Sequence, residues 1–112
     1  MSALGVEVLS AIKSYKEILS HLRNRRSMYV DEKYTSLVYF IQGYNHGIQD
    51  TTNYNLLLEF QEWLRTKVDH HFSIHWGWYI LNHMAAHDEK VATDKLFSLF
   101  DEFLNYRTSM LS

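Results

Sequence analysis

The chain contains no cysteine and no proline, and only four of its 112 residues are glycine. The lack of cysteine excludes disulfides and thiolate metal sites, and it fits a protein kept in a reducing cytoplasm. Folds built from strands and tight turns need frequent glycine and proline, so the scarcity of both favours helices. The sequence therefore predicts an all-α, cytoplasmic protein.

Long apolar runs and a strong charge of one sign are also missing. No stretch is apolar for long enough to span a membrane, and the N-terminal segment carries Glu7 without the basic residues that open a signal peptide. The formal net charge is only −2, which does not suit a protein that coats nucleic acid or an anionic membrane. We therefore expect neither a membrane nor a nucleic acid as the partner.

Apolar residues recur at helical spacing in five segments. A Ser-x-x-Glu capping box at Ser14–Glu17 marks the first clear helix start, although apolar spacing continues back to Val8. The later helices are expected from about Thr35 to 47–50, over 56–68, over 76–84 and over 90–107. We predict a compact array of about five helices, forming a single helical domain over residues 1–112.

Histidines gather in the second half of the chain, where five of the seven lie within residues 70–87. His71 and His75, like His83 and His87, have the i, i+4 spacing that places two imidazoles on one helix face, where they can hold zinc. No HExxH motif and no cysteine is present to complete such a site. Solvated or hydrogen-bonded histidines are therefore favoured, and a small metal-binding protein that uses these four residues is the alternative.

No catalytic constellation is visible. The pairs Asp31-Glu32, Asp88-Glu89 and Asp101-Glu102 are adjacent in sequence, so on a helix their side chains diverge by about 100° and cannot share acid–base work. Asp88 has a simpler role as the N-cap of the last helix. There is no nucleophile motif and no glycine-rich phosphate loop. We expect a protein without enzymatic activity and without a cofactor.

Three arginines lie within residues 23–26. They could contact phosphate, which makes a small nucleic-acid-binding regulator a weaker alternative, but Asp31 and Glu32 follow closely and reduce the local charge. A helix C-terminus with solvated arginine side chains is favoured. The next residues, Met28-Tyr29, are predicted to plug the turn before the second helix.

These segments combine into a pattern that resembles a known family. RRSMYV at residues 25–30 is followed by FIQGY at 40–44, Phe60-x-x-Trp63, Gly77-Trp78 and a closing LFSLFDEFL at 96–104. This arrangement is similar to the RRPxMYxG…FLxGY…DEFL pattern of short bacterial proteins from polymorphic-toxin and contact-dependent-inhibition loci. The similarity covers nearly the whole chain. Such proteins act as immunity proteins beside a toxin gene.

Two residues depart from the family pattern. Ser27 stands where the pattern has proline, and Asp31 stands where it has glycine. Glycine adopts positive φ freely and aspartate does so less readily, so the turn can have a different backbone shape.

The resemblance implies a protein that binds and neutralises a cognate protein toxin, with nucleases as one class of toxin. A nuclease has a basic cleft, which acidic residues would complement. A blocking surface also needs a few central anchors. We expect the partner-binding residues to be Tyr29, Asp31, Glu32, Trp78, Asp88 and Glu89. An exposed aromatic face would also allow a homodimer.

Overall fold

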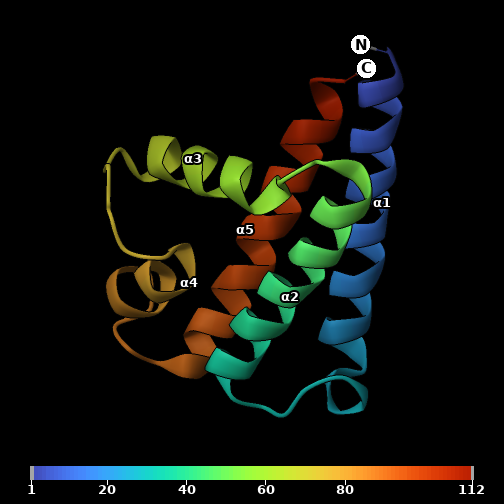
Figure 1. Ribbon diagram of the computed structural model, residues 1–112. Coiled ribbons are helices and arrows are strands. Elements are labelled where there is room, and N and C mark those ends of the chain that lie inside the picture. The colour runs from blue at the N-terminus through green and yellow to red at the C-terminus, as the bar shows by residue number, and fades with distance from the viewer. Residues whose placement is uncertain (1, 112) are drawn as a thin grey trace.

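The computed structural model describes residues 2–111 and, within that range, the side chains of all residues except 2–4 and 27. Five α-helices are present and the described range contains no strand, so the all-α prediction is confirmed (Figure 1). The elements are α1 (Ser2–Asn24), the 3₁₀ turn η1 (Arg26–Met28), α2 (Tyr34–Thr52), α3 (Leu56–Val68), α4 (Trp76–Tyr79), the π turn η2 (Ile80–Met84) and α5 (Glu89–Ser109). No helix within this range is long and apolar enough to cross a membrane.

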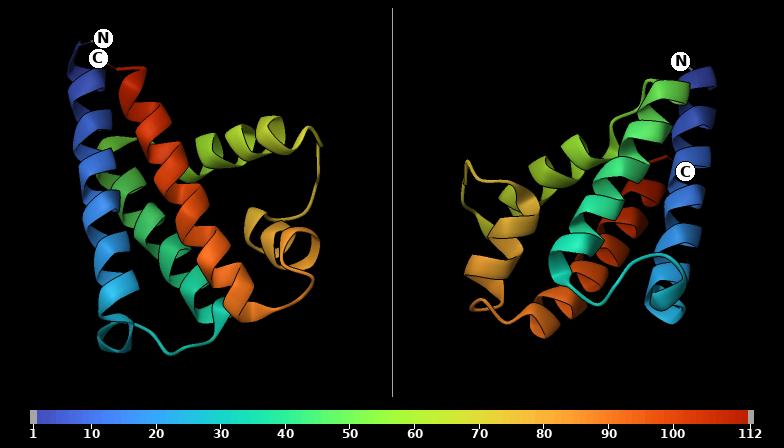
Figure 2. Two further views of the ribbon diagram at one scale, coloured as in Figure 1. Left: turned by 180° about the vertical axis from the view of Figure 1, so that it is seen from behind. Right: turned by 60° about the horizontal axis from the view of Figure 1, so that its bottom comes forward.

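The last helix, α5, is the centre of the fold. It contacts α1, α2, α3 and η2, and the views from both sides show it between the upright α1 and the α3–α4 side of the molecule (Figure 2). Its Phe100 is fully buried, stacks on Phe60 of α3 with ring centroids 4.0 Å apart, and meets the edge of Trp76 of α4 at 5.5 Å. The radius of gyration is 13.9 Å, near the roughly 13 Å expected for a compact chain of this length.

The first helix begins twelve residues earlier than the capping box indicated, at Ser2 rather than Ser14. Val8, Ile12, Tyr15 and Leu19 are buried at helical spacing, so one continuous apolar stripe carries the helix through Ser14. The capping box at Ser14 is therefore not a helix start, whereas the apolar spacing that continues back to Val8 does belong to the same helix. A serine three residues before a glutamate occurs equally well in the middle of a helix whose core stripe continues on both sides.

The boundaries of α2 and α5 lie close to the predictions. The N-terminus of α2 is one residue before Thr35, but its C-terminus extends past the expected end at 47–50 to Thr52, whose hydroxyl donates a hydrogen bond to the Ile48 carbonyl at 2.7 Å. Asn53 then ends α2 in the left-handed region, with φ of 60°. The Asp88 carboxylate accepts hydrogen bonds from the backbone N–H groups of Lys90 and Val91, so its predicted role as an N-cap is confirmed.

A buried polar network joins the first three helices. Asn45 of α2 is buried, and its Oδ1 accepts a hydrogen bond from the Tyr15 hydroxyl of α1 at 2.5 Å. The same oxygen accepts from the Leu57 N–H, while Asn45 Nδ2 donates to Asn55, the N-cap of α3. Burial raises the pKa of the Tyr15 phenol, so the group stays protonated and remains a donor. Asn45 thus fixes α2 against both neighbours.

A close backbone approach joins α4 to α2. A Cβ atom added to Gly77 would lie 2.9 and 3.0 Å from the two methyl carbons of Val38, so only glycine fits there without a shift. The Tyr34 hydroxyl donates a hydrogen bond to the Gly77 carbonyl at 2.7 Å. The short helix α4 is therefore seated on the N-terminal half of α2.

Replacing Asn45 by leucine should lower the free energy of unfolding by about 2–4 kcal/mol, because it leaves the buried Tyr15 hydroxyl and the Leu57 N–H without an acceptor. Urea denaturation followed by circular dichroism would measure this loss. Tyr15→Phe should cost more than Tyr44→Phe, since the Tyr44 hydroxyl makes only a long, 3.3 Å bond to Ser14. Equal costs for the two tyrosines would contradict the importance of the network.

Gly77→Ala should destabilise the protein by about 1–3 kcal/mol, because valine is too short and stiff to move away from the new methyl group. Gly43→Ala is the matched control: a Cβ there meets no atom within 4 Å in the interior of α2, so it should stabilise by about 0.5–1 kcal/mol. Thermal unfolding of both variants would test the pair. A neutral Gly77→Ala would mean that α4 is not held against α2.

Candidate functional site

Most of the expected partner-binding residues are brought together at the N-terminus of α2. Glu89 Oε1 accepts a hydrogen bond from the Tyr34 N–H at 2.9 Å, and the Trp78 ring meets the Tyr34 ring edge-on with centroids 6.3 Å apart. Asp31 and Glu32 lie in the loop directly before Tyr34 and are exposed. Segments more than forty residues apart in sequence therefore meet here.

Tyr29 stands apart from this group. Its ring lies 6.1 Å from Phe40 of α2 and 6.0 Å from His21 of α1, on the α1 side of the loop. Met28 is 73 % exposed, so the prediction that it plugs the turn is wrong, whereas Tyr29 packs between α1 and α2. The loop is instead held by Arg26, which donates hydrogen bonds to the carbonyls of Asp31 (2.9 Å) and Lys33 (2.6 Å).

Three of the four acids at this end already hold backbone N–H groups. Asp31 accepts from Lys33, Asp88 caps α5, and Glu89 caps α2. Hydrogen bonds, first from the Ser36 side chain and then from the Lys33 N–H, hold the pKa of Asp31 below its ordinary value. Glu32 is exposed and makes no hydrogen bond within residues 2–111. The acids therefore serve first as caps of helices and turns.

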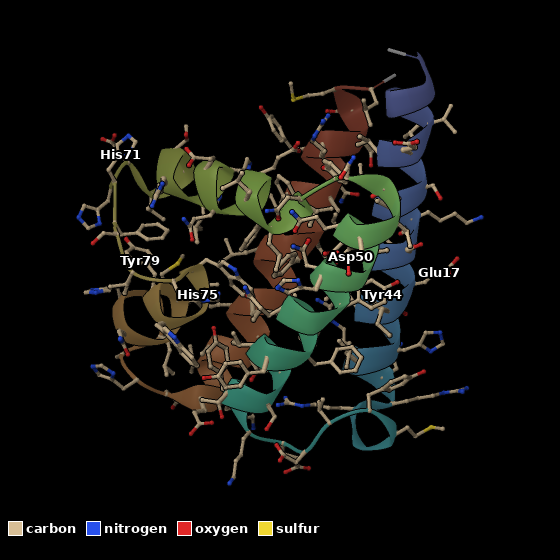
Figure 3. The ribbon with its side chains drawn as sticks, viewed as in Figure 1. Glu17, Tyr44, Asp50, His71, His75 and Tyr79 are labelled. Carbon is tan, nitrogen blue, oxygen red and sulfur yellow. The ribbon has the colours of Figure 1, made fainter. Side chains whose placement is uncertain are left out.

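The four histidines of the metal alternative do not converge. Over residues 2–111, no three His, Asp or Glu side chains come close enough to hold a metal ion. His71, His83 and His87 are exposed, whereas His75 is partly buried. Figure 3 shows His71 on the outer loop after α3 and His75 between α4 and α2.

His75 joins α4 to α2 through both ring nitrogens. Its Nδ1 accepts a hydrogen bond from the Gly77 N–H at 3.0 Å and so caps α4, and its Nε2 lies 2.8 Å from Gln42 Oε1. The first bond requires a bare Nδ1 and the second a protonated Nε2, so the geometry selects the neutral Nε2–H tautomer. Burial lowers the pKa of His75, which also favours this neutral form.

A small aromatic pocket lies on one side of the Gln42–His75 bond. It holds about 160 Å³ and is lined by Val38, Tyr39 and Trp78 besides the bonded pair. The rings of Tyr39 and Trp78 meet at nearly a right angle, with centroids 6.1 Å apart. Tyr39 is 66 % exposed, so most of its ring is open to solvent and available to a partner.

A polar cleft of about 200 Å³ lies on the other side of the same bond, between α2 and α3. Half of its lining residues carry carboxamides, and the others are two histidines, two leucines and Trp76. The carboxamide residues are Gln42, Asn45, Gln49, Asn55 and Gln61. Because Gln42 and His75 line both hollows, the aromatic pocket and the amide cleft form one surface along α2, which we call the α2 groove.

Three other hollows are larger than either half of the α2 groove; the smallest of the three, about 380 Å³ between α1 and α5 beside Phe97, has one ring and no carboxamide. Of the other two, one of about 490 Å³ lies between α3 and α5 beside Leu58 and Tyr106, and one of about 430 Å³ lies between α1 and α5 beside the Arg23–Asp101 ion pair. The first has aromatic rings but no carboxamide, and the second has carboxamides but no ring. Volume alone does not identify a site. The α2 groove is the better candidate because, among these hollows, it joins aromatic rings with carboxamides.

The sequence did not single out most of the α2 groove. Tyr39, Gln42, His46 and Gln49 recur at i, i+3, i+7 and i+10, which places them on one face of α2 beside the buried stripe. That spacing is the one sequence signal by which this polar face of α2 could have been predicted. No sequence pattern predicts the pairing of Gln42 with His75, which is 33 residues away.

Stability should fall as the pH drops below about 6.5, the ordinary pKa of histidine, because the unfolded chain then takes up a proton that folded His75 resists. One such proton contributes up to about 1.4 kcal/mol per pH unit. His75→Asn retains a capping acceptor but does not titrate, so urea denaturation between pH 7.5 and 5 should show a shallower pH dependence. The control is His71→Asn, at an exposed position; a His75→Asn slope equal to that of the unchanged protein would refute the assignment.

The comparisons with known proteins assign no family to this geometry. No family model, no characterised protein and no solved structure gives a significant match to the chain.

Proposed function

We propose that this chain is an immunity-type protein, which binds a cognate bacterial toxin through the α2 groove and thereby neutralises it. The observation that carries the proposal is that aromatic rings and carboxamides meet in one groove. Of the two rings, Tyr39 is exposed and Trp78 half-buried. The side chains of Gln49 and Gln61 make no hydrogen bond within residues 2–111. Tyr39 and Trp78 supply the large rigid rings that most often anchor protein interfaces. The resemblance to proteins of toxin loci supplies the kind of partner.

The acids at the N-terminus of α2 support a toxin with a basic surface. The four acids Asp31, Glu32, Asp88 and Glu89 outnumber by one the bases beside them, which are Lys33, Lys90 and Arg26, whose side chain bonds the Asp31 and Lys33 carbonyls. A negative field beside the groove would speed the approach of a basic cleft, such as that of a nuclease.

A binding role without catalysis is supported by the use of the titratable groups. His75, Asp88 and Glu89 each accept a hydrogen bond from a backbone N–H at the start of a helix. Side chains that hold helix ends cannot exchange protons freely without loosening the fold. The groove therefore suits binding, because these three titratable side chains in and beside it already hold backbone N–H groups.

Tyr39→Ala and Trp78→Ala should each weaken toxin binding by about 30-fold or more, the loss typical of a central anchor of about 2 kcal/mol. The protein would be titrated into the purified product of the adjacent gene by calorimetry, and survival of cells that express that product would be scored in parallel. Tyr106→Ala, which removes an exposed tyrosine at the hollow between α3 and α5, is the matched control and should bind normally.

Two results would count against the proposal in different ways. If the unchanged protein neither binds the adjacent product nor protects cells, the immunity function is wrong. If it binds but Tyr39→Ala and Trp78→Ala bind equally well, the function stands and the α2 groove is not the interface.

A further inference from the structure

We infer that the α2 groove binds an extended peptide segment, with an arginine side chain in the aromatic pocket and the segment's backbone along the amide cleft. This inference rests on the proposed function, because the segment would belong to the neutralised partner. To the proposed function it adds the chemical nature of the partner segment that the groove would bind.

The aromatic pocket suits a flat cation. Tyr39 and Trp78 form two walls at nearly a right angle, and the aromatic faces attract a cation that lies over them. No lysine or arginine lines either half of the groove among residues 2–111, so nothing there repels a positive charge. The carboxylate of Glu89 lies close to the pocket: it accepts a hydrogen bond from the Tyr34 N–H, and the Tyr34 ring packs against Trp78.

Arginine fits this pocket better than lysine. Its guanidinium is planar, stacks on aromatic rings and is less strongly hydrated than an ammonium group, so moving it from water onto a ring face in the corner that Tyr39 and Trp78 form costs less solvation. Its stem of methylene groups would also lie against Val38, the aliphatic residue of the pocket.

The amide cleft suits a peptide backbone. The side chains of His46, Gln49 and Gln61 make no hydrogen bond within residues 2–111, and those of Gln42 and Asn55 have their amide N–H₂ groups unused. A carboxamide carries one acceptor and a pair of donors, which match the C=O and N–H of a peptide group. A row of such side chains can therefore pair with the backbone of an extended chain. Within the described part of the chain, the amide cleft has no aspartate, glutamate, lysine or arginine in its lining, so it favours a neutral backbone over a charged group at this point.

The spacing of the two halves sets the length of the segment. Tyr39 and His46 are seven residues apart on α2, or about 10 Å along the helix axis. An extended chain covers about 3.3 Å per residue, so three residues beyond the arginine reach the far half of the amide cleft. A heptapeptide with a central arginine therefore spans the groove in either direction.

The probe is an acetylated, amidated peptide, Gly-Gly-Gly-Arg-Gly-Gly-Gly, titrated into the full chain and followed by two-dimensional NMR. The indole N–H signal of Trp78, assigned with Trp78→Phe, and the side-chain amide signals of Gln49 and Gln61 should shift together. The same peptide with citrulline, which has arginine's shape without its charge, should bind at least fivefold more weakly. Tyr39→Ala should weaken binding of the arginine peptide by a similar factor; because Tyr39 is mostly exposed, the variant should fold, which its own spectrum would verify.

Each alternative outcome overturns a defined part of the inference. Equal binding of the citrulline peptide would overturn the choice of a cation, and a shift of Trp78 without Gln49 and Gln61 would overturn the extended backbone. A peptide that shifts neither set of signals would overturn both. These results are independent of the calorimetry with the adjacent gene product: a chain that binds that product but not the peptide retains the immunity function and loses only the inferred arginine segment.

Discussion

The contact between Gly77 and Val38 is the constraint on which the α2 groove depends. It brings the first turn of α4 so close to α2 that His75 can reach Gln42, and the Tyr34 hydroxyl fixes the same turn from the other side. Trp78 follows one residue later and therefore meets Tyr39. A bulkier residue at position 77 would separate the helices, and the bond that both halves of the groove share would be the first to lengthen. The α2 groove is thus a direct consequence of a missing side chain.

The backbone adopts unfavourable conformations in the segment that follows α4. The helix widens into the π turn η2, and Ala86 and His87 then adopt left-handed backbone angles, with φ of 49° and 66°, which residues with a Cβ avoid. The hydrogen bond from the His87 N–H to the Leu81 carbonyl, at 2.8 Å, closes this turn. The turn delivers Asp88 to the start of α5 and Glu89 to the start of α2, so two helix ends are capped by adjacent residues. These caps, together with the burial of α5, offset the strain.

Local sequence patterns were sufficient to predict the helices but not to predict the α2 groove. Apolar spacing located the helices because each must bury one stripe, and Asp88 was predictable because an aspartate before a helix caps it. The Ser14 capping box failed because its signature ignores the stripe that continues on both sides. The bonds that build the groove join residues 33 to 55 positions apart, such as His75 with Gln42 and Glu89 with Tyr34. No periodicity within one helix contains such pairings, which arise only when α4 is seated on α2.

The structure changes what the acids can contribute to the proposed interface. A carboxylate that caps a helix, as Asp88 and Glu89 do, cannot turn to a partner without releasing the N–H groups it holds. It nevertheless retains its charge, and that charge acts over about 8 Å at physiological ionic strength. The acids therefore suit the long-range attraction of a basic toxin, whereas close anchoring falls to groups free to make new contacts, above all Tyr39 and Trp78. Raising the salt concentration should then slow association with such a toxin far more than it speeds dissociation, because the screened charges lie beside the contact and not within it.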